Sequence, residues 1–194
     1  MSVKHRVVLI SGKQGSGKST TANGLVEKLV ANGYPQTRIF KFAGPLYEMH
    51  DAVLEVLGKY GIKRPDLVKD GPLLQVLGTE WGRSTVDTNI WVKCAQNTVQ
   101  NWFDRRPYDS AIAILDDCRF ENEFDAFPEA LKVRLECSAA TRQKRCSMWR
   151  ENQKHPSETG LDMYAELGKF DVVYETEYFS TGGIIEDLAK RLMY

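Results

Sequence analysis

The stretch Arg6-Val-Val-Leu-Ile-Ser-Gly-Lys-Gln-Gly-Ser-Gly-Lys-Ser-Thr20 joins an apolar run to the octapeptide GKQGSGKS. It satisfies the pattern G-x-x-x-x-G-K-[ST] of a phosphate-binding loop, with Gly12, Gly17, Lys18 and Ser19 at the fixed positions. Such a loop directs several backbone N–H groups at a polyphosphate, because glycine lets the main chain curl closely around it. β-branched residues precede the loop and a segment with helical apolar spacing follows it. We therefore interpret the stretch as strand, loop and helix rather than as a chance turn.

This loop predicts a site for ATP or GTP. The expected contacts with the nucleotide come from Gly12, Gln14, Gly15, Ser16, Gly17, Lys18, Ser19 and Thr20. Lys18 is expected to reach the β- and γ-phosphates, and the Ser19 hydroxyl to hold Mg²⁺. The helix that follows adds the positive end of its dipole. ATP and Mg²⁺ are therefore the expected cofactors.

Composition narrows the class of protein. The chain has 194 residues, of which 42% are hydrophobic and 27% charged, as in an ordinary globular domain. Its formal net charge of zero gives no global field to recruit nucleic acid or an anionic membrane. The four cysteines form no CxxC pair, which favours reduced thiols over a zinc site or disulfides. We expect no signal peptide, and no apolar run reaches the ~20 residues that span a bilayer, so a cytoplasmic location is expected.

Strands and helices alternate along the chain. Strands are predicted at residues 6–11, 37–43, 111–117, 131–136 and 170–174, and helices at 18–31, 45–58, 71–82, 89–103 and 183–192. Strands separated by helices imply a parallel sheet with right-handed crossovers. The predicted fold is a single α/β domain over residues 1–194: a P-loop NTPase fold, with a parallel sheet of about five strands flanked by helices.

Polar residues follow the strand predicted at 111–117. Ligands of an open parallel sheet bind outside the carboxyl ends of its strands. The alternation of side chains along a strand predicts that only one of Asp116 and Asp117 faces the site, and which one stays open at this point. We favour Asp117 and Arg119 as functional residues, with Asp117 binding Mg²⁺ or a sugar hydroxyl. The alternative is a helix cap with solvated charges.

A basic segment follows the strand predicted at 131–136. Arg142 and Arg145 are three residues apart, so on a helix they share one face, with Arg150 two turns on. Small P-loop kinases use arginines on a lid to neutralise the phosphoryl group in transfer and to exclude water. We predict that Arg142 and Arg145 are catalytic residues of a lid at about residues 138–160. The alternative is a solvated basic helix.

An ordered set of short segments carries a family resemblance. The segments are Phe42-Ala-Gly-Pro-Leu46, Leu73-Leu-Gln-Val-Leu-Gly-Thr-Glu-Trp-Gly-Arg83, Ile90-Trp-Val92, Asp117-Cys-Arg-Phe-Glu-Asn-Glu123 and His155-Pro-Ser-Glu158. Together they resemble the bacteriophage deoxynucleoside monophosphate (dNMP) kinases over nearly the whole chain. The resemblance implies transfer of the ATP γ-phosphoryl group to a dNMP, giving dNDP and ADP for DNA precursor supply, in the host cytoplasm if a phage encodes the chain. Tyr47 stands where some relatives carry lysine, so other cations are expected to hold the acceptor phosphate.

The same resemblance implies roles for particular residues. Arg83 would grip the acceptor phosphate from a helical acceptor-binding segment at about residues 44–105. The acceptor's sugar and base would be lined by Gln75, Trp91, Asp117, Arg119 and Glu123. Trp91 could stack on the base, although a buried tryptophan is the commoner outcome in an apolar neighbourhood. His155 is expected to donate or accept hydrogen bonds in a loop rather than to act as a catalyst. Small-molecule substrates are the expected partners, and a homodimer stays open.

The chemistry of a phosphate acceptor agrees with this reading on separate grounds. Its attacking oxygen is already anionic, so no general base is needed, and the sequence offers no convincing Ser-His or Asp-His pair. Catalysis then depends on positioning and on cancelling charge. Three alternatives remain: a kinase with a hydroxyl acceptor and Asp117 as base, a non-catalytic ATP-binding module, and a GTPase. The last is disfavoured because the N-K-x-D pattern is missing.

Overall fold

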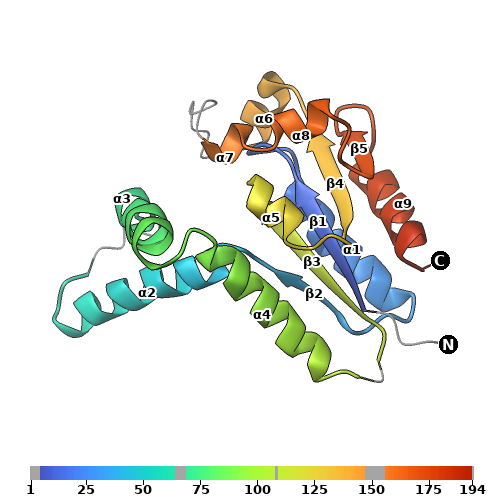
Figure 1. The fold of residues 1–194 in the computed structure, drawn as a ribbon. Helices are drawn as coiled ribbons and strands as arrows, with labels where there is room; N and C mark the ends of the chain where they lie inside the picture. The colour runs from blue at the N-terminus through green and yellow to red at the C-terminus, as the bar shows by residue number, and fades with distance from the viewer. Residues whose placement is uncertain (1–4, 64–68, 108, 147–155, 194) are drawn as a thin grey trace. The chain divides into compact units, whose positions relative to one another are not determined.

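The computed structural model of the protein describes residues 5–63, 69–107, 109–146 and 156–193. Two compact units account for the chain (Figure 1). One consists of Met1–Lys41 with Val99–Tyr194, and the other is Phe42–Thr98. The sequence predicts a single domain with an acceptor-binding segment at about residues 44–105. That segment overlaps the second unit.

Five strands and the helices between them make up the described chain. The strands are β1 (His5–Ser11), β2 (Thr37–Phe40), β3 (Ala111–Cys118), β4 (Leu131–Glu136) and β5 (Val172–Glu175). The helices are α1 (Lys18–Ala31), α2 (Gly44–Lys59), α3 (Gly71–Gln75), η1 (Val76–Val86), α4 (Ile90–Asp104), α5 (Glu121–Asp125), α6 (Ala139–Arg145), α7 (Pro156–Thr159), α8 (Asp162–Glu166) and α9 (Thr181–Met193).

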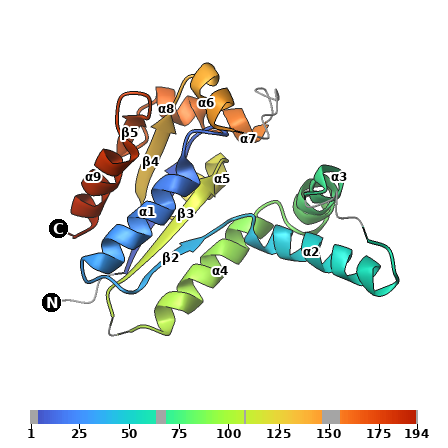
Figure 2. The same cartoon turned by 180° about the vertical axis from the view of Figure 1, so that it is seen from behind.

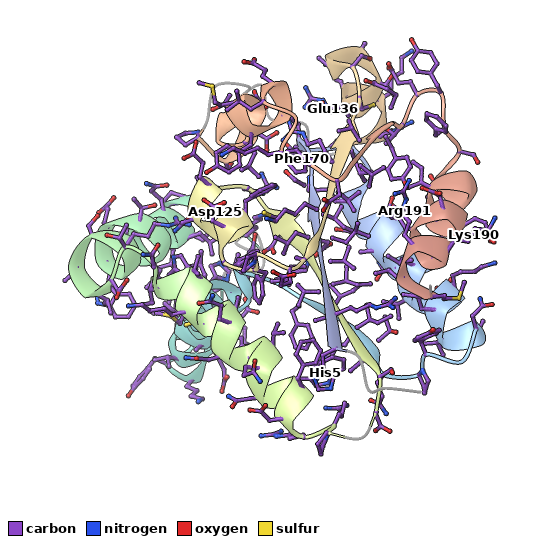
Figure 3. All side chains as sticks on the ribbon, turned by 45° about the vertical axis from the view of Figure 1, so that its right-hand side comes forward. His5, Asp125, Glu136, Phe170, Lys190 and Arg191 are labelled. Atoms are coloured by element: carbon purple, nitrogen blue, oxygen red, sulfur yellow. The ribbon has the colours of Figure 1, made fainter. Side chains whose placement is uncertain are left out.

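The five strands form one sheet in the order β2-β3-β1-β4-β5, and every neighbouring pair is parallel. Parallel neighbours require crossover connections, which the intervening helices supply. Figure 3 shows His5 at the amino end of β1 and Glu136 at the carboxyl end of β4, at opposite ends of the sheet. The structure confirms the predicted α/β fold with a five-stranded parallel sheet, and the phosphate-binding loop leaves β1 at the carboxyl edge.

One face of the sheet is covered by α1 and α9, which lie side by side (Figure 2). Leu25 and Leu29 of α1 and Leu188 of α9 are fully buried against the sheet. Burial of a leucine side chain contributes about 1.5–3 kcal/mol to stability. This core fixes α1, and therefore the loop that precedes it, relative to the strands.

The other face of the sheet carries an aromatic cluster. Phe124 of α5 packs edge-to-face against Tyr164 of α8 and against Phe170, with both ring centroids 5.0 Å away. Figure 3 labels Phe170 in this layer. Edge-to-face pairs add about 0.5–1.5 kcal/mol each beyond their buried area. The cluster holds α5 and α8 beside each other, although neither short helix was predicted from the sequence.

Strand β3 contains a bulge near its carboxyl end. Leu9 of β1 pairs with Leu115, but Ser11 pairs with Cys118. Asp116 and Asp117 therefore lie together opposite the single residue Ile10. A bulge of this kind disrupts the strict alternation of side chains, so the prediction that the two aspartates point to opposite faces does not apply.

The second unit consists of α2, α3, η1 and the first residues of α4. The segment predicted as a helix at residues 71–82 is helical throughout, as α3 to Gln75 and then as the π-helix η1, which continues to Val86. The Asp87 N–H bonds the Gly82 carbonyl five residues back, at 3.0 Å. Such widened turns often occur at functional sites.

In the first unit, β2 ends at Phe40, three residues before the strand end predicted at Ala43.

Candidate nucleotide-binding site

The phosphate-binding loop has a backbone that requires glycine. Gly12, Gly15 and Gly17 have φ angles of 146°, 80° and 98°. A Cβ atom on Gly12 would lie 2.5 Å from the Leu135 carbonyl oxygen, and one on Gly15 would lie 2.8 Å from that of Arg142. Both close contacts are with backbone, which cannot rotate away. Apart from its two chain neighbours, a Cβ on Gly17 would meet no atom within 4 Å, so the loop is open where it meets α1. This shape fits a bound polyphosphate.

Lys18 lies over the loop at the start of α1. Its Nζ donates to the carbonyl oxygens of Gly12 at 2.6 Å and Lys13 at 2.9 Å. Burial lowers the pKa of Lys18 from 10.5 to about 7, and the positive charges of Arg119 and Arg134 act in the same direction. A bound anion would favour the charged ammonium. The site is therefore a cationic one that gains from binding a phosphate.

Ser19 and Asp116 meet beside this lysine. The Ser19 hydroxyl donates to Asp116 Oδ2 at 2.7 Å, and the Lys41 ammonium bonds Asp116 Oδ1 at 2.6 Å. Asp116 is almost completely buried. The sequence favoured Asp117 as the aspartate that faces the loop, whereas the Ser19 hydroxyl bonds Asp116. Asp117 is half-buried one residue further along, and its predicted binding roles stay predictions.

Arg119 is tied to the segment that contains α7. Its Nη1 donates to Glu158 Oε1 at 2.7 Å and to the Ser157 carbonyl at 3.2 Å. The other carboxylate oxygen of Glu158 accepts the backbone N–H of Gln14 at 2.7 Å. Glu158 thus joins Arg119 to the phosphate-binding loop.

Glu123 has a local structural role at the start of α5. Its carboxylate accepts the backbone N–H groups of Arg119 at 2.8 Å and Phe120 at 3.2 Å, and it is buried. Capping of this kind satisfies N–H groups that the helix leaves unpaired. The contact fixes the backbone of Arg119, whereas the predicted contact of Glu123 with the acceptor stays a prediction.

A second ionic group supports the loop from α8. Asp162 bonds Lys13 and Arg134, each at 2.8 Å, and Arg134 also bonds Glu136 at 2.6 Å. The Arg134 side chain is only 3% exposed, so it needs these carboxylates as partners. We did not predict this group. The signal in the sequence was an arginine inside the apolar run of β4, in Leu131-Lys-Val-Arg-Leu-Glu136.

The two predicted lid arginines bond backbone oxygens. Arg142 is buried, and donates to the Cys137 and Gln14 carbonyls, both at 3.2 Å. Arg145 is exposed, and donates to the side chain and carbonyl of Thr176 at 3.0 and 2.9 Å. Arg142 therefore supports the phosphate-binding loop from one side. Closure of either arginine over ATP stays a prediction, and Arg150 lies outside the described residues.

Three of the residues predicted for the acceptor lie in the second unit. Gln75 is exposed at the end of α3, and Arg83 is half-buried in η1. Trp91 is a core residue: it is 4% exposed, and its indole N–H donates to the Gly78 carbonyl at 2.9 Å. This burial favours the packing alternative over base stacking. His155, which was predicted as a hydrogen-bonding residue of a loop, lies outside the described residues.

The comparisons with known proteins concern the fold. No protein-family model and no curated protein sequence matches the chain. The solved structures that match nearly all of it include TT1252 from Thermus thermophilus, with a TM-score of 0.61 and 14% identity over 98% of this chain and 97% of that one. A shikimate kinase from Bacteroides thetaiotaomicron has a TM-score of 0.50 and 11% identity over 97% of this chain and 99% of that one. APE1195 has a TM-score of 0.50 and 16% identity over 99% of this chain and 96% of that one.

The loop, the sheet order and these matches define the class of fold. The chain has a P-loop NTPase fold with a five-stranded parallel sheet, a fold that it shares with the shikimate kinase among these structures. The matches do not indicate a bacteriophage origin or a deoxynucleotide acceptor. Within the described residues, no helix is long and apolar enough to cross a membrane.

Proposed function

We propose that the chain is an ATP-dependent phosphotransferase that transfers the γ-phosphoryl group of ATP to a deoxynucleoside monophosphate. One observation carries the proposal: the half-buried Lys18 ammonium bonds the Gly12 and Lys13 carbonyls of the glycine loop, where desolvation and then the charges of Arg119 and Arg134 lower its pKa. An electropositive pocket of this kind stabilises phosphate groups and the charge that moves between them during transfer.

The roles of the residues follow from their positions. The loop N–H groups hold the phosphates, and Lys18 exchanges its bonds with the Gly12 and Lys13 carbonyls for bonds to phosphate oxygens. Ser19 and Asp116 together would hold Mg²⁺, which supplies charge neutralisation when bound. The Arg119 guanidinium would bind the acceptor phosphate.

A phosphate acceptor suits the charge of the site. Both carboxylate oxygens of Asp116 are engaged, one by the Ser19 hydroxyl and one by the Lys41 ammonium, so neither is directed at a hydroxyl acceptor. A monophosphate needs no base, since its attacking oxygen is already anionic. The family-like segments in the sequence supply the deoxynucleoside part of the proposal. Arg83 is its proposed contact with the acceptor phosphate, and Gln75 and Asp117 are its proposed contacts with the sugar and base.

A hydroxyl acceptor is the second candidate. The fold likeness to a shikimate kinase favours it, since that enzyme phosphorylates the compound in its name. A hydroxyl must lose a proton during transfer, and half-buried Asp117 would be the base. Asp117 therefore has a different role in each candidate: it contacts the sugar of a dNMP acceptor, but it accepts the proton of a hydroxyl acceptor.

A coupled assay of ADP release tests both candidates. The acceptors are the dNMPs, the corresponding ribonucleotides, and hydroxyl compounds that include shikimate, each with MgATP. Phosphorylation of one or more dNMPs supports the first candidate, and phosphorylation of a hydroxyl compound alone replaces it with the second. ATP binding with no acceptor turned over would make the chain a binding module.

Lys18→Ala tests whether the phosphoryl transfer measured in this assay depends on the phosphate-binding loop. We expect a folded variant whose turnover is lower by about three orders of magnitude or more, because Lys18 stabilises charge that develops in the transition state. Thermal unfolding followed by circular dichroism checks the fold. A folded variant with near-normal transfer would remove the proposed function.

A further inference from the structure

Glu158 has a position that neither the fold nor a substrate contact explains. Its side chain is 12% exposed, and both carboxylate oxygens are used: one accepts the Gln14 N–H, the other the Arg119 guanidinium, both at 2.7 Å. Hydrogen bonds to a charged carboxylate are about twice as strong as neutral ones. Glu158 therefore fixes a loop amide and a guanidinium next to the same phosphate site.

We propose that Glu158 is a positioning residue, which holds Arg119 and the leading edge of the phosphate-binding loop in the geometry that binds MgATP and acceptor. This inference rests on the proposed phosphotransferase function. Both described side-chain bonds of Arg119 use Nη1. Within the described residues its Nε and Nη2 make no bond, so an oriented guanidinium edge remains for a phosphate.

The opposite role for Glu158 is that of a substitute anion, which would fill the site and leave when ATP binds. The packing of its segment argues against departure. A Cβ on Gly160 would lie 2.7 Å from the Arg119 carbonyl oxygen and 2.8 Å from that of Pro156, so the backbones are in close contact. Asp162, four residues after Glu158, is bonded to both Lys13 and Arg134. A segment held at these points keeps Glu158 in place.

Glu158→Gln tests the proposal, because it keeps the size of the side chain and removes the charge. The matched control is Glu166→Gln, on the same segment but exposed. MgATP binding is measured by calorimetry without an acceptor. We expect about tenfold weaker binding for Glu158→Gln and no change for the control, in line with the effect of losing partners that orient site residues. Tighter binding would identify a substitute anion, and unchanged binding would show no role; either result overturns the proposal.

A double-mutant cycle tests whether Glu158 acts through Arg119. Glu158→Gln, Arg119→Met and the double variant are compared by kcat/KM with whichever acceptor the wild type uses. We expect the double variant to lose little more than Arg119→Met alone, since a positioning residue has no effect without the residue it positions. Additive losses would overturn the proposed action through Arg119.

An NMR measurement separates this proposal from the proposed function. In ¹⁵N-labelled protein without nucleotide, the Gln14 amide proton should be shifted downfield by its bond to the carboxylate, and should move upfield in Glu158→Gln. If the wild type shows this shift but does not bind MgATP, the proposed function fails while the contact stands. If the shift is the same in both proteins, the contact is absent and the positioning proposal fails.

Discussion

Lys18 and Asp116 show how neighbours determine what a single side chain does. An isolated lysine is charged at neutral pH, but burial and two nearby cations lower the pKa of Lys18 to about 7. The buried carboxylate of Asp116, in contrast, has a cation and a donor beside it: the Lys41 ammonium and the Ser19 hydroxyl both bond it. Lys18 is therefore suited to binding an anion, and Asp116 to binding a cation.

The low pKa of Lys18 predicts that ATP binding takes up protons. The phosphates favour the ammonium form, so the pKa rises in the complex. At pH 8, one unit above the free value, we expect uptake of nearly one proton, and apparent affinity should fall as pH rises above about 7. Calorimetry at pH 8 in buffers of different ionisation enthalpy measures this uptake. Lys18→Arg, which stays charged, is the control. Equal heats for the wild type in all buffers would contradict the prediction.

Asp116 and Asp117 should differ in their importance for Mg²⁺. Asp116→Asn keeps the shape and removes the charge beside Ser19, so we expect kcat/KM to fall on the order of a hundredfold and the Mg²⁺ requirement to rise. Asp117→Asn should cost less than about tenfold. Steady-state kinetics across Mg²⁺ concentrations check the ranking, with thermal unfolding to verify the fold. The reverse ranking would favour Asp117 as a base and a hydroxyl acceptor.

At the scale of elements, η1 shows how packing overrides local preference. Its residues have helical spacing, and the sequence alone predicts an ordinary α-helix. Trp91 of α4 packs against Gly78 and Gly82, two buried glycines of η1, and bonds the Gly78 carbonyl. Gly82 leaves room for the indole ring, and the bond to the Gly78 carbonyl ties α4 to η1.

Gly82→Ala should therefore destabilise the second unit. Its Cβ would lie 2.6 Å from the Trp91 ring and 2.7 Å from the Leu77 carbonyl oxygen, and neither can move cheaply. We expect a loss of about 1–3 kcal/mol in the free energy of unfolding. Gly58→Ala in α2 is the matched control, because nothing lies within 4 Å of that Cβ, and it should stabilise by about 0.5–1 kcal/mol. Urea denaturation followed by tryptophan fluorescence measures both; equal stabilities would contradict the packing argument.

For the molecule as a whole, stability and chemistry have different locations. The core between the sheet and the helices α1 and α9 lies on one face of the sheet, while the phosphate-binding residues gather at its carboxyl edge. A change deep in this core should alter stability without altering affinity for ATP, provided that the fold persists.

Leu188→Ala tests this separation. Leu188 is fully buried, so its truncation leaves a cavity and should lower the free energy of unfolding by about 2–5 kcal/mol. Leu167→Ala removes the same atoms from a side chain that is 64% exposed, and should change it by less than about 0.5 kcal/mol. Chemical denaturation and the KM for ATP are measured for each variant. A large rise in KM with the fold intact would show that the core and the site are coupled.

Local patterns in the sequence determined the phosphate-binding loop and the class of fold. Gly12, Gly15 and Gly17 adopt the positive φ angles that only glycine tolerates well, and the alternating strands and helices form the predicted parallel sheet. These features depend on near neighbours in the chain, so spacing and residue type are enough to predict them.

Only the tertiary structure decided which charged groups meet. The bulge in β3 arises from its pairing with β1, and it places Asp116 rather than Asp117 on Ser19. Glu158 reaches Gln14 across 144 residues of chain. No periodicity in the sequence records such contacts, because each depends on strand pairing and on the packing of distant segments. The sequence determined where phosphate binds, and the tertiary structure determined which side chains surround it.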